Sequence, residues 1–433
     1  MVATIIIASL TFIGVILSII FFPHIKIGKI QLDTYWMISL LGAVVLLATS
    51  LAPITEVGKQ LVSNSKINPL KILVLFFSMT IISVYLDEIG LFRYLAVLAT
   101  KRAKNNQYVL FLILYGLTAL LTVFTSNDIV ILTLTPFICF FCKNTKINPL
   151  PYLIAEFAAA NTWSMMFIIG NPTNIYLGTS AGIDFIHYLK VMWLPTLCAG
   201  LVQLLLIFLV FHKKLKDPIN IVEDDFHISS KLDLIIGLSV LFVCLVFLII
   251  SSYINVEMWL ISLICATSLV LISLIIRLIT KKNWQYIASS VKRLPYQLIP
   301  FFLSMFVIVV ALNHQGISDW LSNLLNQQQV IWIYGPASFL FSNVINNIPM
   351  SILFSNLPTS LDALNYTRAI YASIVGSNIG AFFTPFGALA GIMFSSLVAH
   401  QQIKFTFWDF TKYGAIIAIP TLAMTLLMLS VVI

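Results

Sequence analysis

The sequence predicts an all-α polytopic membrane protein with two inverted repeats of five transmembrane spans, each repeat carrying a re-entrant hairpin and an unwound helix. Three observations lead to this fold class. Of the 433 residues, 60% are hydrophobic and only 9% are charged, whereas soluble domains carry about 25% charged residues. Apolar segments long enough to cross a bilayer follow one another along the chain. Polar residues interrupt some of these segments at matching places in the two halves.

Ten apolar segments have the length of a transmembrane span. Two further apolar stretches, 106–142 and 328–358, are too long for one helix and contain polar residues near the middle, which predicts two hairpins. The first segment lacks the basic start and the cleavage site of a signal peptide, so we predict a span there. The ten predicted spans are 2–22, 34–52, 69–88, 150–180, 187–211, 231–251, 256–276, 297–313, 365–398 and 410–432.

The distribution of positive charge predicts the orientation. If each hairpin returns to its starting side, 19 of the 24 Lys and Arg residues fall on the side opposite the N-terminus. Lys and Arg accumulate in cytoplasmic loops. We therefore expect a multi-pass protein of the plasma membrane with both termini outside. The formal net charge of +8 then reflects contact with membrane lipid, and nucleic acid is not an expected partner.

Short motifs recur in the same order in the two halves. FFSM at Phe76 to Met79 returns as FLSM at Phe302 to Met305, and SND at 126–128 returns as INN at 345–347. Asn161 precedes Gly170 by nine residues, as Asn378 precedes Gly387. The sequence therefore contains an internal repeat.

The repeat predicts the domain organisation. Residues 1–212 form the first repeat with a cytoplasm-facing hairpin, 213–231 a cytoplasmic linker, and 232–433 the second repeat with an outward-facing hairpin. An odd number of crossings in each half inverts the second copy. Inverted halves with interrupted helices are typical of secondary transporters.

Four polar breaks interrupt the apolar helices: Ser126 to Asp128, Asn161 to Asn174, Asn346 to Pro349, and Gly376 to Gly387. Prolines and glycines in them favour helices that stop and restart. Irregular backbone at membrane depth is tolerated where it is buried in protein or lines a cavity, and restarted helices offer unpaired N–H groups. The alternative is packing by small residues. No Lys or Arg lies at a break, which favours a small neutral or singly charged solute.

The embedded carboxylates are candidates for coupling to an ion gradient. Asp128 lies at a break and Glu156 lies within an apolar segment, so each is a candidate for binding a proton or Na⁺. We expect Asp87 and Glu88 to form a salt bridge at the membrane surface, close to Arg93.

Nothing in the sequence indicates an enzyme. It contains no P-loop, no GxGxxG and no HExxH motif, so we predict no catalytic residue, no metal site and no cofactor beyond a coupling ion, H⁺ or Na⁺. The CFFC sequence at 139–142 is interpreted as small apolar filling of a helix face, and we predict no disulfide.

Several motifs together resemble those of the arsenite efflux permeases: LDEIGLFRYLA, SND followed by LTLTPF, NNIPM, and NIGAFFTPFGALA. These permeases belong to the ion transporter superfamily, with citrate transporter-like domains, sodium/proton antiporters and sodium-coupled dicarboxylate carriers. The resemblance spans residues 30 to 430. It implies two hairpin tips and two unwound helices around one site, an elevator-like cycle, and homodimers.

The resemblance also assigns candidate substrate-binding residues by motif. They are Ser126, Asn127, Asp128, Asn161, Gly170, Asn171, Asn174, Asn346, Asn347, Asn378, Thr384 and Gly387. The dicarboxylate carriers resemble one another in a Ser-Asn-Thr at both tips, whereas the tips here read SND and INN, which disfavours di- and tricarboxylates. The leading hypothesis is proton-coupled efflux of an arsenite-type oxyanion or solute. The alternatives are a sodium- or proton-coupled organic anion carrier of the citrate or dicarboxylate type, and a sodium/proton antiporter.

Overall fold

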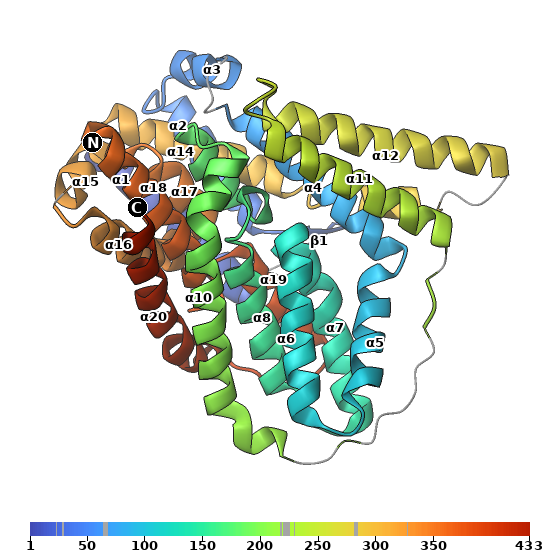
Figure 1. The fold of residues 1–433 in the computed structure, drawn as a ribbon. Coiled ribbons are helices and arrows are strands. Elements are labelled where there is room, and N and C mark those ends of the chain that lie inside the picture. Colours follow the sequence, from blue (N-terminus) through green and yellow to red (C-terminus); the bar gives the residue numbers. More distant parts are fainter. Residues whose placement is uncertain are drawn as a thin grey trace.

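The computed structural model describes residues 1–22, 24–27, 30–63, 68–216, 219, 226–228, 230–280, 285–326 and 328–433. These residues are almost entirely helical, which confirms the predicted fold class (Figure 1). Within them, eight helices are long and apolar enough to cross a membrane, which supports a multi-pass membrane protein. The eight are α1, α4, α6, α7, α10 with the short helix after it, α11, α12 and α20.

The first half begins with a helix and a β-hairpin and ends with a 27-residue helix. Its elements are α1 (Val2–Phe21), β1 (His24–Ile27), β2 (Ile30–Asp33), α2 (Tyr35–Ala48), α3 (Ile54–Val62), α4 (Pro69–Glu88), α5 (Leu91–Ala103), α6 (Gln107–Phe124), α7 (Asn127–Thr145), α8 (Leu150–Trp163), η1 (Ile168–Gly170), α9 (Pro172–Ser180) and α10 (Phe185–Phe211).

A short 3-10 helix, η2 (His212–Leu215), follows α10 directly. The α-helices of the second half then follow the order of the α-helices in the first half, and the 3-10 helix η3 (Leu357–Ser360) lies between the seventh and the eighth of them. They are α11 (Lys231–Ile250), α12 (Met258–Thr280), α13 (Gln285–Lys292), α14 (Leu298–His314), α15 (Ile317–Leu325), α16 (Val330–Ile345), α17 (Asn347–Phe354), α18 (Ala363–Gly380), α19 (Leu389–His400) and α20 (Phe407–Val432). Much of the predicted linker, 213–231, lies outside the described residues.

The two halves bend at equivalent glycines. Gly90 follows α4 with φ +89°, and Gly316 follows α14 with φ +72°; both are in the left-handed region that glycine adopts without strain. After each glycine the chain continues as a second helix, and α14 and α15 differ in direction by 81°. The sequence prediction did not include α5, α15 or the β-hairpin, because these short elements are too polar to be recognised as spans.

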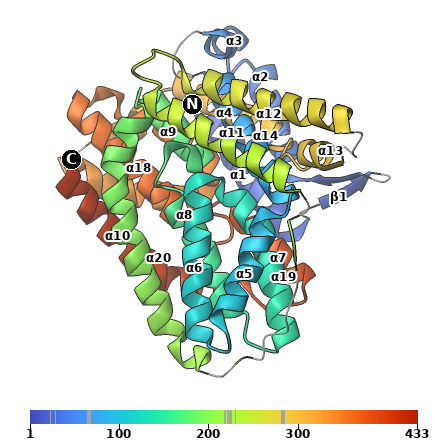
Figure 2. The same cartoon turned by 45° about the vertical axis from the view of Figure 1, so that its right-hand side comes forward.

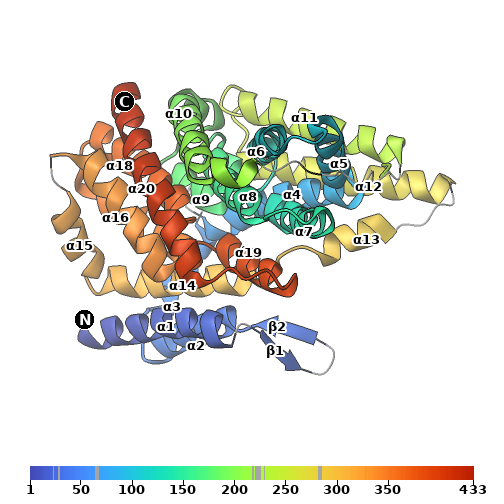
Figure 3. The ribbon, with the colours of Figure 1, turned by 90° about the horizontal axis from the view of Figure 1, so that it is seen from below.

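The two repeats interlock. The α2 helix of the first half packs on α14 of the second, and α12 of the second half packs on α4 of the first. The final helices of the two halves, α10 and α20, also lie against each other (Figures 2 and 3). Each half thus packs one of its early helices on a helix of the other half, as expected for two halves related by a two-fold axis. These contacts join the two halves into one packed body.

Two predicted breaks begin later than expected. The helix α18 continues through Gly376 to Gly380, so the interruption lies at 381–388. Asn161 likewise lies inside α8, and that interruption begins after Trp163. Small residues at 376 and 380 do not end the helix, because α16 packs closely against them: a Cβ on Gly376 would lie 2.1 Å from the carbonyl oxygen of Gly335. Here glycine serves helix packing.

Two ion pairs join the end of α4 to Arg293, which follows α13 in the other half. Arg293 pairs with Asp87 at 2.7 Å and with Glu88 at 2.6 Å. The expected salt bridge therefore exists, but its cation is Arg293 and not the neighbouring Arg93, whose guanidinium lies over the ring of Phe226. The prediction of Arg93 as the partner is wrong because a cation distant in sequence is brought closer by the exchange of helices between the repeats.

A further ion pair, Asp233 with Arg277 at 2.7 Å, is almost fully buried between α11 and α12. Tyr85 of α4 donates to the other carboxylate oxygen of Asp233 at 3.3 Å, and Ser273 donates to Tyr85 at 2.9 Å. The pair thus anchors α11 and α12 to α4.

We predict that Asp233→Asn lowers stability by about 3–5 kcal/mol, because it leaves the Arg277 charge buried without its carboxylate. The double variant Asp233→Leu with Arg277→Met should recover most of this loss. As the matched control, Glu257→Gln breaks the more exposed pair with Lys71 and should change stability by less than about 1 kcal/mol. Thermal unfolding in detergent measures all three; equal effects at both pairs would contradict the anchoring role.

Candidate functional site

Asn378 of α18 joins the two interrupted helices. Its Oδ1 accepts hydrogen bonds from Ser164 Oγ and Asn171 Nδ2, both at 3.0 Å. Its Nδ2 donates to Asn174 Oδ1 at 2.6 Å. Asn171 also caps α9, because its Oδ1 accepts from the backbone N–H of Thr173 at 3.1 Å. All of these side chains are buried. We call Asn161, Ser164, Asn171, Asn174 and Asn378 the amide cluster.

The first hairpin tip contacts the amide cluster through α8. Asn127, the first residue of α7, donates from Nδ2 to Asn161 Oδ1 at 3.3 Å. Asn161 donates in turn to the Phe157 carbonyl at 2.8 Å, and its own carbonyl accepts from Ser164 Oγ at 2.7 Å. The tip, α8 and α18 therefore form one continuous hydrogen-bonded chain.

Asp128 lies beside this chain and not within it. Its side chain is half-buried and interacts electrostatically with Tyr35 of α2, a helix of the layer that packs on α14. Ser126, and not Asp128, occupies the N-cap position of α7. Among the described residues, no hydrogen bond joins the Asp128 side chain to the asparagines with which the sequence grouped it.

The second hairpin tip is held by its own interrupted helix. Asn346 has φ +74°, donates from Nδ2 to the Phe386 carbonyl at 3.1 Å, and caps α17. The backbone N–H of Asn347 donates to the Gly387 carbonyl at 3.1 Å. Thr384 donates from its N–H at 3.1 Å and its hydroxyl at 2.6 Å to Asn343 Oδ1. Asn346, Asn347, Thr384 and Gly387 are thus together at this second tip.

Two predicted glycines allow close backbone approach. A Cβ on Gly170 would lie 2.3 Å from the Ser164 carbonyl oxygen, and a Cβ on Gly387 would lie 2.5 Å from the Gly380 carbonyl oxygen. Each glycine lets the chain fold back on the end of the preceding helix. Any larger residue there has to shift the backbone that carries the cluster.

Sequence reasoning missed Ser164 and Asn343. Ser164 follows Asn161 by three residues, and Asn343 precedes Asn346 by three. Residues three apart share one face of a helix. That spacing was the available signal, but single Ser and Asn residues are common in membrane helices and carry little information alone.

The site is uncharged apart from the nearby Asp128. Among the described residues, no Lys or Arg donates a hydrogen bond to the amide cluster. Three buried polar atoms at or beside the breaks have no hydrogen-bond partner in the described part of the chain: Ser126 Oγ, Asn127 Oδ1 and Ser377 Oγ. Buried polar atoms normally have partners, so these groups are available to a bound solute or ion.

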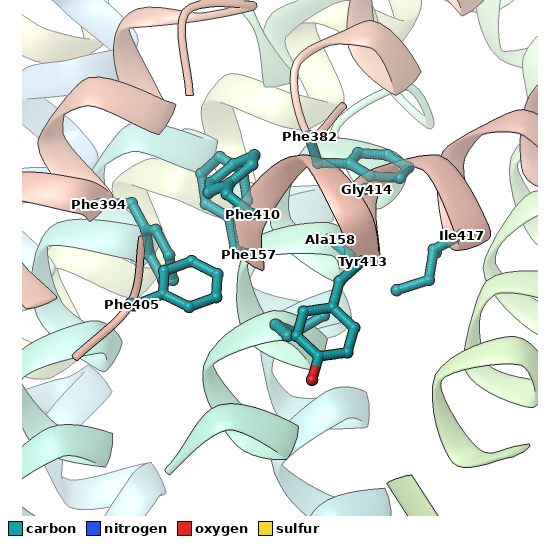
Figure 4. Close-up of a pocket in the computed structure, with 10 residues that line it drawn as sticks. Phe157, Ala158, Phe382, Phe394, Phe405, Phe410, Tyr413, Gly414 and Ile417 are labelled. Atoms are coloured by element: carbon teal, nitrogen blue, oxygen red, sulfur yellow. The ribbon is translucent and has the colours of Figure 1, made fainter. Parts of the chain in front are cut away.

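A small cavity of 20 Å³ lies on one side of α8, with room for about one water molecule. Phe157, Phe382, Phe394, Phe405 and Phe410 line it, and Figure 4 shows the Tyr413 hydroxyl directed away from their rings. An aromatic cavity without free polar groups does not select a polar solute, so the amide cluster remains the candidate site.

A larger cavity of 330 Å³ lies at the far end of α9 from the cluster, between α4, the α9–α10 turn and the α11–α12 turn. Asp184 and Glu257 are among its lining residues. Burial opposes ionisation of Asp184, but hydrogen bonds from His187 prevail and lower its pKa. This polar cavity approaches the interrupted helix from one side.

Two repeats with interrupted helices around buried polar groups define a membrane transporter. The chain belongs to the citrate transporter family, whose model matches residues 30–376. This assignment confirms the predicted superfamily.

Two relatives and one solved structure are similar to the chain over most of its length. The chain is 26% identical over 415 residues to the "Arsenical pump membrane protein" of Escherichia coli, covering 89% of this chain and 91% of that protein. It is 24% identical over 372 residues to the "46 kDa membrane protein" of Mycobacterium leprae, covering 82% and 84%. The Alcanivorax borkumensis YdaH transporter has a similar fold, with a TM-score of 0.52, 14% identity and coverage of 99% and 96%.

We predict that Gly170→Ala greatly reduces transport and lowers stability by about 1–3 kcal/mol, because the added Cβ meets backbone and not a movable side chain. Gly116→Ala is the matched control: it lies in α6 with nothing within 4 Å of the added carbon, and a helical Gly→Ala change is neutral or stabilising by about 0.5–1 kcal/mol. Solute flux in proteoliposomes and thermal unfolding check both; full transport by Gly170→Ala would contradict the close-approach role.

Proposed function

We propose that this protein is a secondary active transporter that exports a small, arsenite-type solute in exchange for protons across the plasma membrane. The single observation that carries the proposal is the amide cluster, in which uncharged amide and hydroxyl groups from two interrupted helices converge without a cation. Such groups suit a small solute that carries hydroxyls and little or no charge. The identity to arsenical pump membrane proteins over most of the chain supports the same solute class.

The arrangement favours a hydroxyl-bearing solute over a polycarboxylate. A citrate-like anion brings several negative charges, and burying them without a paired cation costs several kcal/mol per charge. Helix N-termini such as those of α9 and α17 partly offset one charge. The name of the matched family nevertheless keeps an organic anion as the second candidate, and a sodium/proton antiporter is the third.

Asp128 is the coupling carboxylate of the proposal, because it follows the hairpin tip directly and its side chain is not part of the amide cluster. Both termini outside, and a homodimer, belong to the same proposal. The outward faces of α11 and α12 support contact with lipid or a second copy, since Phe242 is 68% and Leu278 78% exposed.

We expect proteoliposomes containing the protein to move arsenite, with a rate that depends on a pH gradient and not on Na⁺. Citrate, succinate and Na⁺ are tested in the same transport assay for comparison. Asp128→Asn should abolish the effect of the pH gradient while solute exchange continues, and Asp319→Asn, a carboxylate of the exposed helix α15, is the matched control. Saturable citrate uptake without arsenite flux would refute the proposed substrate; unchanged proton coupling in Asp128→Asn would remove Asp128 from the mechanism.

A further inference from the structure

A second carboxylate, Glu156 of α8, is buried against α7, the second helix of the first hairpin. Its side chain is 1% exposed. Thr135 of α7 donates to its Oε2 at 3.1 Å, and no donor or acceptor in the described part of the chain reaches its Oε1. The α6, α7 and α8 helices pack against one another (Figure 2).

Among the described residues, no positively charged group interacts with Glu156. Four long helices, α6, α7, α10 and α18, pack against α8. From α7, the thiol of Cys139 interacts electrostatically with the Glu156 carboxylate. In the described residues, no charged or titratable side chain of α6, α10 or α18 interacts with that carboxylate. An ionised carboxylate with a single neutral donor would be strongly disfavoured there.

The site suits a proton and not a metal cation. Hard cations bind through several oxygen ligands, about six for Mg²⁺ and six to eight for Ca²⁺. In the part of the chain that the structure describes, Thr135 is the one side chain that forms a hydrogen bond with the Glu156 carboxylate. No group of three or more metal-ligating side chains occurs among the described residues. A proton needs only the carboxylate.

Polar side chains continue from Glu156 toward one end of the helices. Cys142 lies one turn beyond Cys139 and interacts electrostatically with Tyr152, which donates to Gln107 at the start of α6 at 2.8 Å. In the other direction, Asn161 of the amide cluster follows Glu156 by five residues, about 7.5 Å along α8. Glu156 is therefore between the basic loop ends of the hairpin and the candidate solute site.

We propose that Glu156 is a proton-binding site of the transport cycle, protonated while α7 packs on α8 and positioned by Thr135. This inference rests on the proposed function for its role in transport. The step is the binding of one proton to one carboxylate oxygen and its release when the helices separate and water reaches the group. Separation of α7 from α8 then depends on whether Glu156 is protonated. Such a dependence is required if proton binding is to be coupled to solute transport.

Infrared spectroscopy of the purified protein in membranes tests the site without a transport assay. The wild type at neutral pH should show the C=O band of a protonated carboxylic acid, and Glu156→Gln should lack it. Thr135→Val should keep the band at a higher frequency, because the C=O group loses its hydrogen bond. Glu257→Gln and Asp128→Asn, which leave Glu156 intact, should retain the band.

Transport then tests the role. Glu156→Gln keeps the shape of the neutral carboxyl, so it should fold and continue solute exchange, but fewer protons should move per solute and the pH profile of transport should flatten. A carboxylic acid band that persists in Glu156→Gln would overturn the site. An unchanged proton-to-solute ratio with loss of the band would overturn its role in coupling. Absence of arsenite flux in the wild type would refute the proposed substrate and leave the infrared result standing.

Discussion

The structure depends on one constraint: backbone groups freed at a helix break have to find partners where no water is available. Asparagine meets this constraint because its amide both donates and accepts. Asn174 donates to the Ser164 carbonyl at the end of α8, and Asn343 donates to the Gly380 carbonyl at the end of α18. Each asparagine thus ties the end of a helix to a neighbouring element, and the breaks are fixed parts of the fold.

The two hairpins are attached to their interrupted helices by contacts of different chemistry. Asn343 lies two residues before the INN tip and bonds Thr384, which follows Asn378 by six. The equivalent residues of the first repeat are Phe124, two before SND, and Phe167, six after Asn161; their rings are 5.8 Å apart. The second hairpin is therefore attached by hydrogen bonds that need fixed geometry, and the first by an aromatic contact that does not.

Local patterns in the sequence predicted the elements that a membrane imposes. The length of the apolar stretches and the polar residues of SND and INN predicted where both hairpins lie. This was possible because hydrophobicity and helix interruption depend on residues close together in the sequence. The partners across the fold were not predictable in this way. Arg293 reaches Glu88 from 205 positions away, and Ser164 joins Asn378 from 214 positions away. Gly376 looked like a break because glycine weakens helices, yet the close packing of α16 retains the helix there.

The amide cluster holds its own hydrogen bonds, so under the proposed function a solute that contacts Asn378 would replace some of them. A solute at Asn378 displaces bonds to Ser164, Asn171 and Asn174, the same bonds that hold α8, α9 and α18 together. A typical hydrogen bond contributes about 0.5–1.5 kcal/mol net, so a solute that offers as many hydroxyls as it displaces binds with little net change from hydrogen bonding. Under the proposed function, occupancy would alter the helix crossing, since a ligand shifts a conformational equilibrium by its difference in affinity for the two states. In the proposed transport cycle, weak and exchangeable binding at the point where the repeats meet would let the solute be released again.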